Sequence, residues 1–324
     1  MTTLLAVLRR KFLTPPLEDA LFSTRGFHEH DEAARDRLEM SGRQAIVGFG
    51  FAMESSDTAE TVTRLETLEQ EFRGFAYEGA AMALALRDAL HPGRHGRRNE
   101  DFLGSGRGAA HIYMAYLGIG FTVARLPRLL WSRALPDVSR LPDHPSLSWF
   151  IWDGYGFHQA YFHPDKWIHR QHVGRRYPWQ VSYVNRAIDH GIGRALWFYN
   201  GADVDGITDS INSFPESRHA DLWGGAGLAA TYAGGVDEEG LELLKKYAGP
   251  HAAEVALGAV LAIKARVLAD TVTAHTELAS SVLCGMPAAD AAEITNRVVI
   301  DLPPDGEVPA YEVFRDRIRR HFTD

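Results

Sequence analysis

Carboxylate and imidazole side chains recur in the glycine-rich segments of the chain, and these groups are the usual basis of acid–base chemistry. Glu78 and Asp153 each stand directly before a glycine, and His158 follows Asp153 by five residues. Both carboxylates lie in apolar surroundings, where burial is costly unless the group is paired or functional. If the chain is an enzyme, we expect Glu78, Asp153 and His158 to be its catalytic groups and to transfer protons. Structural pairing with arginines such as Arg73 or Arg186 is the alternative.

A second set of side chains is placed to hold a substrate. Arg186, His190 and Arg194 are four residues apart, so they can share one helical face and hold an anion or polarise a carbonyl; a surface polar stripe is the alternative. Aromatic residues are dense from 147 to 199, which suggests a pocket for a long apolar or conjugated ligand, although most of these rings must pack in the core. The expected substrate-binding residues are Tyr77, Trp152, Tyr155, His163, Asp189, His190 and Arg194.

Four histidines, His158, His163, His169 and His172, lie within fifteen residues. Imidazole suits zinc, iron or copper, and the last two histidines could chelate a metal from one helical turn. No HExxH motif or second clustered ligand set accompanies them. We therefore favour structural or hydrogen-bonding roles and predict no metal site; the residues identify no cofactor.

The glycines beside these groups belong to a repeat with a period of 31–39 residues. A glycine, one residue, a second small residue and a hydrophobic segment recur, with a weaker last copy, from Gly48, Gly79, Gly118, Gly154, Gly191, Gly225 and Gly258. Such a period is typical of α-solenoids. Glycine in a helix costs about 1 kcal/mol relative to alanine. Two small residues at i and i+2 face nearly opposite sides, however, and let neighbouring helices approach from both. Buried strands are the alternative.

We therefore predict an all-α protein with one solenoid-like domain of about seven helix pairs. Each pair joins a glycine-rich inner helix to a polar outer helix with an acidic start. Residues 1–30 would form an N-terminal cap, 31–300 the repeats and 301–324 a C-terminal cap helix. Two insertions interrupt the repeat, at 91–108, which we expect to be a loop, and at 163–182. Such insertions tend to lie on the functional face of a repeat protein. The expected helices include 31–54, 58–70, 71–90, 217–233, 251–270 and 312–321.

Charge and composition narrow the functional classes. The 324 residues carry a formal net charge of −8, which argues against nucleic-acid binding. One cysteine, Cys284, excludes an internal disulfide and fits a reducing compartment. No apolar run approaches the roughly 20 residues of a membrane-spanning helix. Residues 3–13 form a basic amphipathic helix, which we interpret as a cap in preference to a membrane-surface anchor. A cytoplasmic protein, with peripheral membrane contact through this helix as an option, is the expectation.

Four long segments, 73–83, 153–163, 185–198 and 225–237, resemble a bacterial domain family typified by the UnbL-type proteins of enediyne biosynthetic gene clusters. The resemblance covers nearly the whole chain. It implies a role in converting a linear polyene, made by an iterative polyketide synthase, into an enediyne core, beside companion proteins that include a membrane protein. The resemblance supplies no catalytic residues. We expect the chain to bind a hydrophobic polyene in a groove lined by the inner helices and residues 163–182. The alternative is a non-catalytic scaffold that docks enzymes of the same pathway.

Overall fold

The computed structural model describes residues 4–91, 97–104, 106–141, 145–174 and 181–323. These ranges contain helices, turns and short connections and no strand, so the predicted all-α class is confirmed there. The backbone contacts group the chain into two compact units. Unit 1 comprises Met1–Arg25 and Glu39–Tyr155, and unit 2 comprises Gly26–Leu38 and Gly156–Asp324. That all residues form a single domain stays a prediction.

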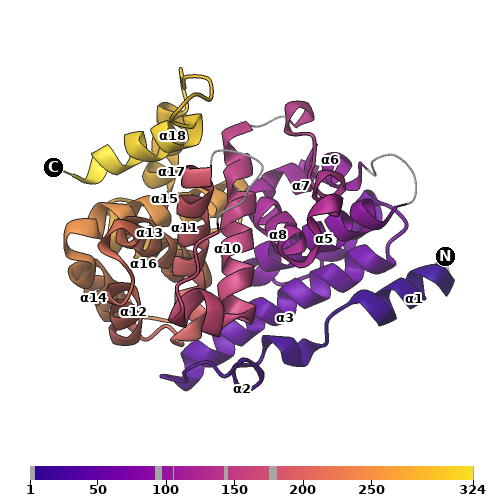
Figure 1. Ribbon diagram of the computed structural model, residues 1–324, viewed down its shortest axis with the longest axis horizontal. Coiled ribbons are helices and arrows are strands. Elements are labelled where there is room, and N and C mark those ends of the chain that lie inside the picture. Colours follow the sequence, from indigo (N-terminus) through magenta and orange to yellow (C-terminus); the bar gives the residue numbers. More distant parts are fainter. Residues whose placement is uncertain (1–3, 92–96, 105, 142–144, 175–180, 324) are drawn as a thin grey trace. The chain divides into compact units, whose positions relative to one another are not determined.

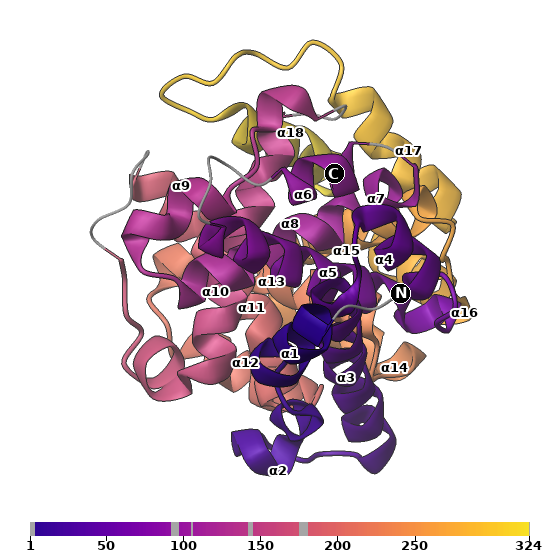
Figure 2. The same cartoon turned by 90° about the vertical axis from the view of Figure 1, so that its right-hand side faces the viewer.

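Unit 1 is built on a row of glycine-bearing helices. In this row α5 (Gln70–Leu90) lies between the unit-1 part of α3 (Glu32–Glu54) and α8 (Ile112–Arg125), and the first residues of α10 (Phe150–Phe162) pack on α8. Figure 2 shows α1 (Leu4–Leu13) beside α3. The connections hold the short helices α2 (Phe22–Arg25), α4 (Thr58–Leu65), α6 (Arg98–Leu103), α7 (Gly106–Ala110) and α9 (Trp131–Ala134).

Unit 2 continues the same principle in its own row. There α13 (Glu216–Ala233) lies between α11 (Val181–Tyr199) and α15 (Ala252–Leu268), and α17 (Ala288–Val298) packs on α15 (Figure 1). An extended connection leads from α17 to α18 (Ala310–Arg319), which contacts α15 and α17 (Figure 2). The outer helices are α12 (Val204–Asn212), α14 (Glu238–Ala248) and α16 (Ala274–Ala279).

Paired glycines in unit 1 bring backbones into contact on two sides of one helix. A Cβ atom at Gly118 of α8 would overlap the carbonyl oxygen of Glu78 on α5. A Cβ atom at Gly120 would overlap the carbonyl oxygen of Ile151 on α10. The expectation that glycines at i and i+2 serve opposite neighbours is confirmed for α8.

The same arrangement recurs in unit 2 on α13. Gly225 lies against the carbonyl oxygen of His190 on α11, and Gly227 lies against that of Val255 on α15. Any side chain at these positions would push the helices apart, so here the absence of a Cβ atom outweighs the poor helix propensity of glycine. The regular spacing of glycines in the sequence therefore arises because successive inner helices of each unit stack through these glycines.

Aspartates begin several outer helices, as expected from the acidic residues at their starts. The carboxylate of Asp57 accepts a hydrogen bond from the backbone N–H of Glu60 at the start of α4, and Asp237 accepts one from Gly240 at the start of α14. Each satisfies a donor that a helix N-terminus otherwise leaves unpaired.

Both insertions contain helical segments. Residues 91–108 include α6 and the start of α7, so the prediction of a loop is wrong for residues 98–103 and 106–108. In the other insertion, Asp165–His169 forms a π-helical turn (η5), and residues 175–180 lie outside the described residues. None of the helices in the described ranges combines the length and apolar character needed to span a bilayer.

Two glycines of α3 give a matched test of the backbone contacts. A Cβ atom at Gly48 would overlap the carbonyl oxygen of Ala76, whereas one at Gly50 would lie 3.5 Å from Nε of Arg10, an ordinary contact. We expect Gly48→Ala to lower the free energy of unfolding by about 1–3 kcal/mol or more. We expect Gly50→Ala to be neutral or to raise it by up to about 1 kcal/mol. Urea unfolding of both variants checks this, and equal effects would contradict the role of the close approach.

Candidate functional site

Tyr77 and Glu78 lie on α5 in unit 1, and both are buried. The Tyr77 hydroxyl donates to Oε1 of Glu66 at 2.7 Å, and its ring stacks on the His111 ring with centroids 3.8 Å apart. Burial and the Glu66 carboxylate raise the pKa of Tyr77 far above its ordinary value, so the phenol stays protonated. Arg73, a candidate partner for Glu78, binds Glu66 and the carbonyl of Leu68. Tyr77 is therefore anchored in the core of unit 1.

Trp152, Asp153 and Tyr155 lie on the unit-1 part of α10. The Trp152 ring is 5.9 Å from that of Tyr155 and 5.7 Å from that of Trp131, so the three side chains form an aromatic cluster. Asp153, which follows Trp152 in the sequence, is also buried. Unit 1 thus holds two of the three predicted catalytic groups, Glu78 on α5 and Asp153 on α10. Each directly precedes a glycine that lies against the backbone of a neighbouring helix.

His158, His190 and Arg194 are buried in unit 2. The His158 ring lies 4.7 Å from the Phe162 ring and 6.3 Å from the ring of His163. The Arg194 guanidinium lies over the Phe157 ring, 4.9 Å from its centre. Arg194 thus contacts α10, while the His190 ring lies against Gly224 of α13.

Asp189 forms a buried ion pair with Arg218. Its Oδ1 and Oδ2 accept hydrogen bonds from Nη2 and Nε of Arg218 at 2.5 and 3.0 Å. Burial raises the pKa of Asp189 to about 6, although the Arg218 guanidinium acts in the opposite direction. The ion pair with Arg218 therefore explains why a carboxylate is buried at position 189.

Four rings of unit 2 form what we call the aromatic band: Phe157, Tyr161, Phe27 and Tyr199. Successive ring centroids are 5.4, 4.8 and 5.7 Å apart. Three segments distant in sequence supply the rings, namely the connection before α3, the unit-2 part of α10, and α11. The band begins beneath the Arg194 guanidinium and ends at the half-buried Tyr199.

An open cavity of about 470 Å³ lies at the Tyr199 end of the aromatic band. We call it the histidine pocket; it is lined by His28, Glu29, His30, His169, Tyr199, Asn200, Asp203, Gly206, Asp209 and Ser210. The Tyr199 hydroxyl is 3.2 Å from Nε2 of His169, which comes from the 163–182 insertion. The insertion and an inner helix therefore line one cavity. That a ligand binds there stays a prediction.

The sequence did not point to the other walls of the histidine pocket. His28 is in the segment expected as a cap, and its backbone N–H donates to the carbonyl of Tyr199. Asn200, at the turn after α11, donates a hydrogen bond to the hydroxyl of Ser210 in α12. Across the described part of the chain, no three His, Cys, Asp or Glu side chains come together as metal ligands.

Sequence reasoning also missed a buried charge cluster in unit 2. The Asp221 carboxylate accepts hydrogen bonds from Arg186 of α11 and Arg315 of α18, both at 2.8 Å. Burial alone would raise the pKa of Asp221, but the two guanidinium groups outweigh it and hold that pKa below the usual range. Glu312 completes the cluster by pairing with Arg186 at 3.1 Å. The alternating charges of the last helix were the available signal.

Removing the carboxylate charge of Asp221 should destabilise the protein strongly. Asp221→Asn leaves Arg186 and Arg315 with Glu312 as their remaining counterion, and a buried pair broken in this way costs about 3–5 kcal/mol. Asp316→Asn on α18 is the control; its pairs with Arg319 and Arg320 lie near the surface, where loss costs about 1 kcal/mol or less. Urea unfolding measures both. Equal losses would show that burial of the cluster adds nothing.

The raised pKa of Asp189 predicts a pH dependence with a defined sign. An unfolded aspartate has a pKa of about 3.9, so between about pH 4 and pH 6 the native state binds more protons than the unfolded state. This group's contribution therefore decreases by about 2–3 kcal/mol as the pH rises through that range. Subtracting the unfolding profile of Asp189→Asn from that of the wild type should reveal this decrease. A flat or rising difference would refute the raised pKa.

A known protein family matches nearly the whole chain. The family model described as "Protein of unknown function (DUF1702)" matches residues 4–322. No curated protein and no solved structure matches the chain. Because that match spans nearly every residue, the chain belongs to the DUF1702 family of proteins of unknown function.

Proposed function

We propose that this protein binds a linear polyene or a similar apolar intermediate in bacterial enediyne-type polyketide biosynthesis and helps to convert it. The observation that carries the proposal is the aromatic band of unit 2, which leads from Arg194 to the histidine pocket. Three of its rings pack on one another in the core, and the fourth, Tyr199, lines the pocket, where a conjugated chain of alternating double bonds can stack on it. The resemblance of four long segments to UnbL-type proteins supports the same pathway.

The histidine pocket would hold the polar end of the intermediate. His28, His169, Tyr199 and Asn200 combine hydrogen-bond donors and acceptors around the open cavity. Acidic side chains at Glu29, Asp203 and Asp209 in the same lining disfavour an anionic group there. The ligand end that fits is therefore a neutral hydroxyl or carbonyl group.

His158 is the predicted catalytic group that adjoins the aromatic band. Its ring packs on Phe162, whose ring is 5.0 Å from that of Tyr161. We propose that His158 transfers a proton to or from a bound polyene, with Glu78 and Asp153 as the further acid–base candidates. The proposed location is the cytoplasm, with peripheral membrane contact through α1.

A neutral fluorescent tetraene, the methyl ester of trans-parinaric acid, tests binding. We expect saturable fluorescence enhancement with the wild-type protein and an affinity reduced about tenfold or more in Tyr199→Ala, which removes one ring of the band and one wall of the pocket. His251→Ala is the matched control, since His251 is half-buried in unit 2 and its ring contacts only His219 among the aromatic pairs of the described residues. Absence of saturable binding, or equal affinities in all three proteins, would refute the ligand site.

Catalysis requires a separate test in an enediyne-producing bacterium. We expect His158→Ala and Asp153→Asn to lower product formation about 100-fold or more, as loss of a general acid or base does, while the linear polyene accumulates. Mass spectrometry of extracts measures both compounds, and circular dichroism confirms that each variant folds. Normal product titres would instead favour a non-catalytic scaffold.

A further inference from the structure

Within unit 1, helix α1 packs on α3 through the side that carries Arg9 and Arg10. Ala6 is buried, Nε of Arg9 donates to the carbonyl oxygen of Met53 at 3.1 Å, and Nη1 of Arg10 binds Oε2 of Glu54 at 2.6 Å. These residues meet the C-terminal turn of α3, where unpaired carbonyl groups favour cations. The contact therefore directs two of the three basic side chains of α1 to α3, and one of them, Arg10, forms an ion pair there.

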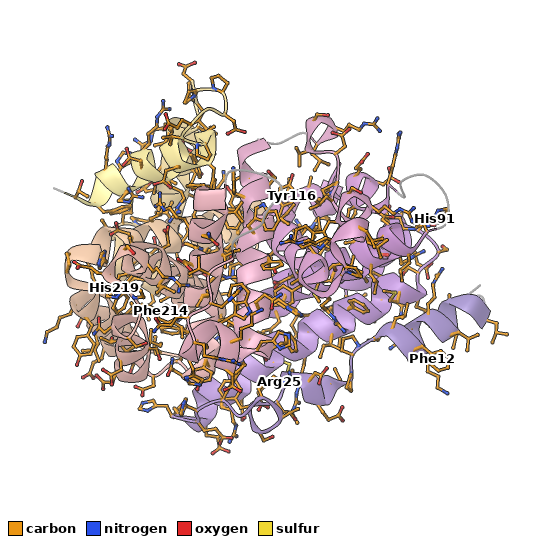
Figure 3. The ribbon with its side chains drawn as sticks, viewed as in Figure 1. Phe12, Arg25, His91, Tyr116, Phe214 and His219 are labelled. Atoms are coloured by element: carbon orange, nitrogen blue, oxygen red, sulfur yellow. The ribbon has the colours of Figure 1, made fainter. Side chains whose placement is uncertain are left out.

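The apolar side of α1 faces solvent. The exposed fractions are 76% for Leu4, 45% for Val7, 39% for Leu8 and 74% for Phe12. At about 100° per residue these four side chains fall on one stripe, opposite the residues that contact α3. Figure 3 shows Phe12 pointing away from the neighbouring helix. Leu17, in the helical turn that follows α1, is also exposed, at 47%.

Positive charge accompanies this stripe. Lys11 is exposed and follows Val7 by four residues and Leu8 by three, so it lies on the same side of the helix. The ten residues of α1 contain no acidic side chain, in a chain whose net charge is −8. An ammonium group beside exposed leucine and phenylalanine can reach lipid phosphates while its methylene stem covers apolar surface.

We propose that the stripe formed by Leu4, Val7, Leu8, Lys11 and Phe12 docks on the surface of an anionic phospholipid bilayer. A ten-residue helix is about 15 Å long, which is half of a hydrocarbon core, so α1 lies in the interface. Charge separates a bilayer from a second copy of the chain as the occupant. A symmetric pair would bring two positively charged stripes together, whereas anionic headgroups complement Lys11. This proposal is independent of polyene binding.

Vesicle flotation of the full chain tests the proposal, with phosphatidylcholine vesicles that contain or lack phosphatidylglycerol. We expect binding that depends on phosphatidylglycerol and weakens at high salt. Leu8→Gln/Phe12→Gln should reduce the affinity at least about tenfold, and Lys11→Gln about fivefold. The matched control is Ile300→Gln/Val308→Gln, which changes two side chains that are 61% and 55% exposed beside acidic residues of unit 2, and it should bind as the wild type does.

Folding and self-association are measured on the same proteins. All changed side chains are exposed, so circular dichroism and melting temperature should match the wild type. Phe12→Trp provides a second measurement, because brominated lipid should quench its added fluorescence on vesicles. Failure of the wild type to bind phosphatidylglycerol vesicles, or equal binding by Leu8→Gln/Phe12→Gln, would overturn the proposal. A dimer in light scattering that this double variant converts to a monomer, without vesicle binding, would assign the stripe to a second copy instead.

Discussion

Close approach of inner-helix backbones, possible only where a Cβ atom is absent, sets the spacing of each row of helices. In unit 1 the carbonyl of Glu78 touches Gly118, and in unit 2 the carbonyl of His190 touches Gly225. Both contacts involve the backbone of a residue whose side chain was a candidate for chemistry. The orientation of these side chains is therefore tied to the stacking, because neither helix can rotate without breaking the glycine contact. Packing and candidate chemistry depend on the same positions.

Much of the helical fold could be predicted because its determinants are local. The glycine period marks helices that lie against two neighbours, and aspartates such as Asp57 and Asp237 mark where outer helices begin. The exact ends of short helices were harder to predict from the sequence. The helix expected to reach residue 70 ends at Leu65, and α6 forms where a loop was expected, because a few residues of helix depend on tertiary contacts more than on propensity.

The candidate site was harder to predict because its walls come from distant parts of the sequence. Tyr199 and His169 were in segments already singled out, but His28 and Phe27 belong to a connection with no periodicity or motif. The Asp189–Arg218 pair illustrates a different difficulty. A carboxylate in an apolar helix has the same sequence signature whether it awaits a substrate or is neutralised by an arginine 29 residues later. Only the three-dimensional structure distinguishes a carboxylate that awaits a substrate from one that is paired with an arginine.

The charge cluster of unit 2 also has a consequence for the order of synthesis. Arg315 follows Asp221 by 94 residues in the chain, yet its guanidinium supplies one of the two hydrogen-bonded cations of that carboxylate. At about 5–20 residues per second, a ribosome needs roughly 5 to 20 seconds to translate this interval. During that time α11 and α13 can stack through their glycines, while Asp221 and Arg186 still have access to water. The complete, dehydrated charge cluster therefore cannot form before α18 has been synthesised.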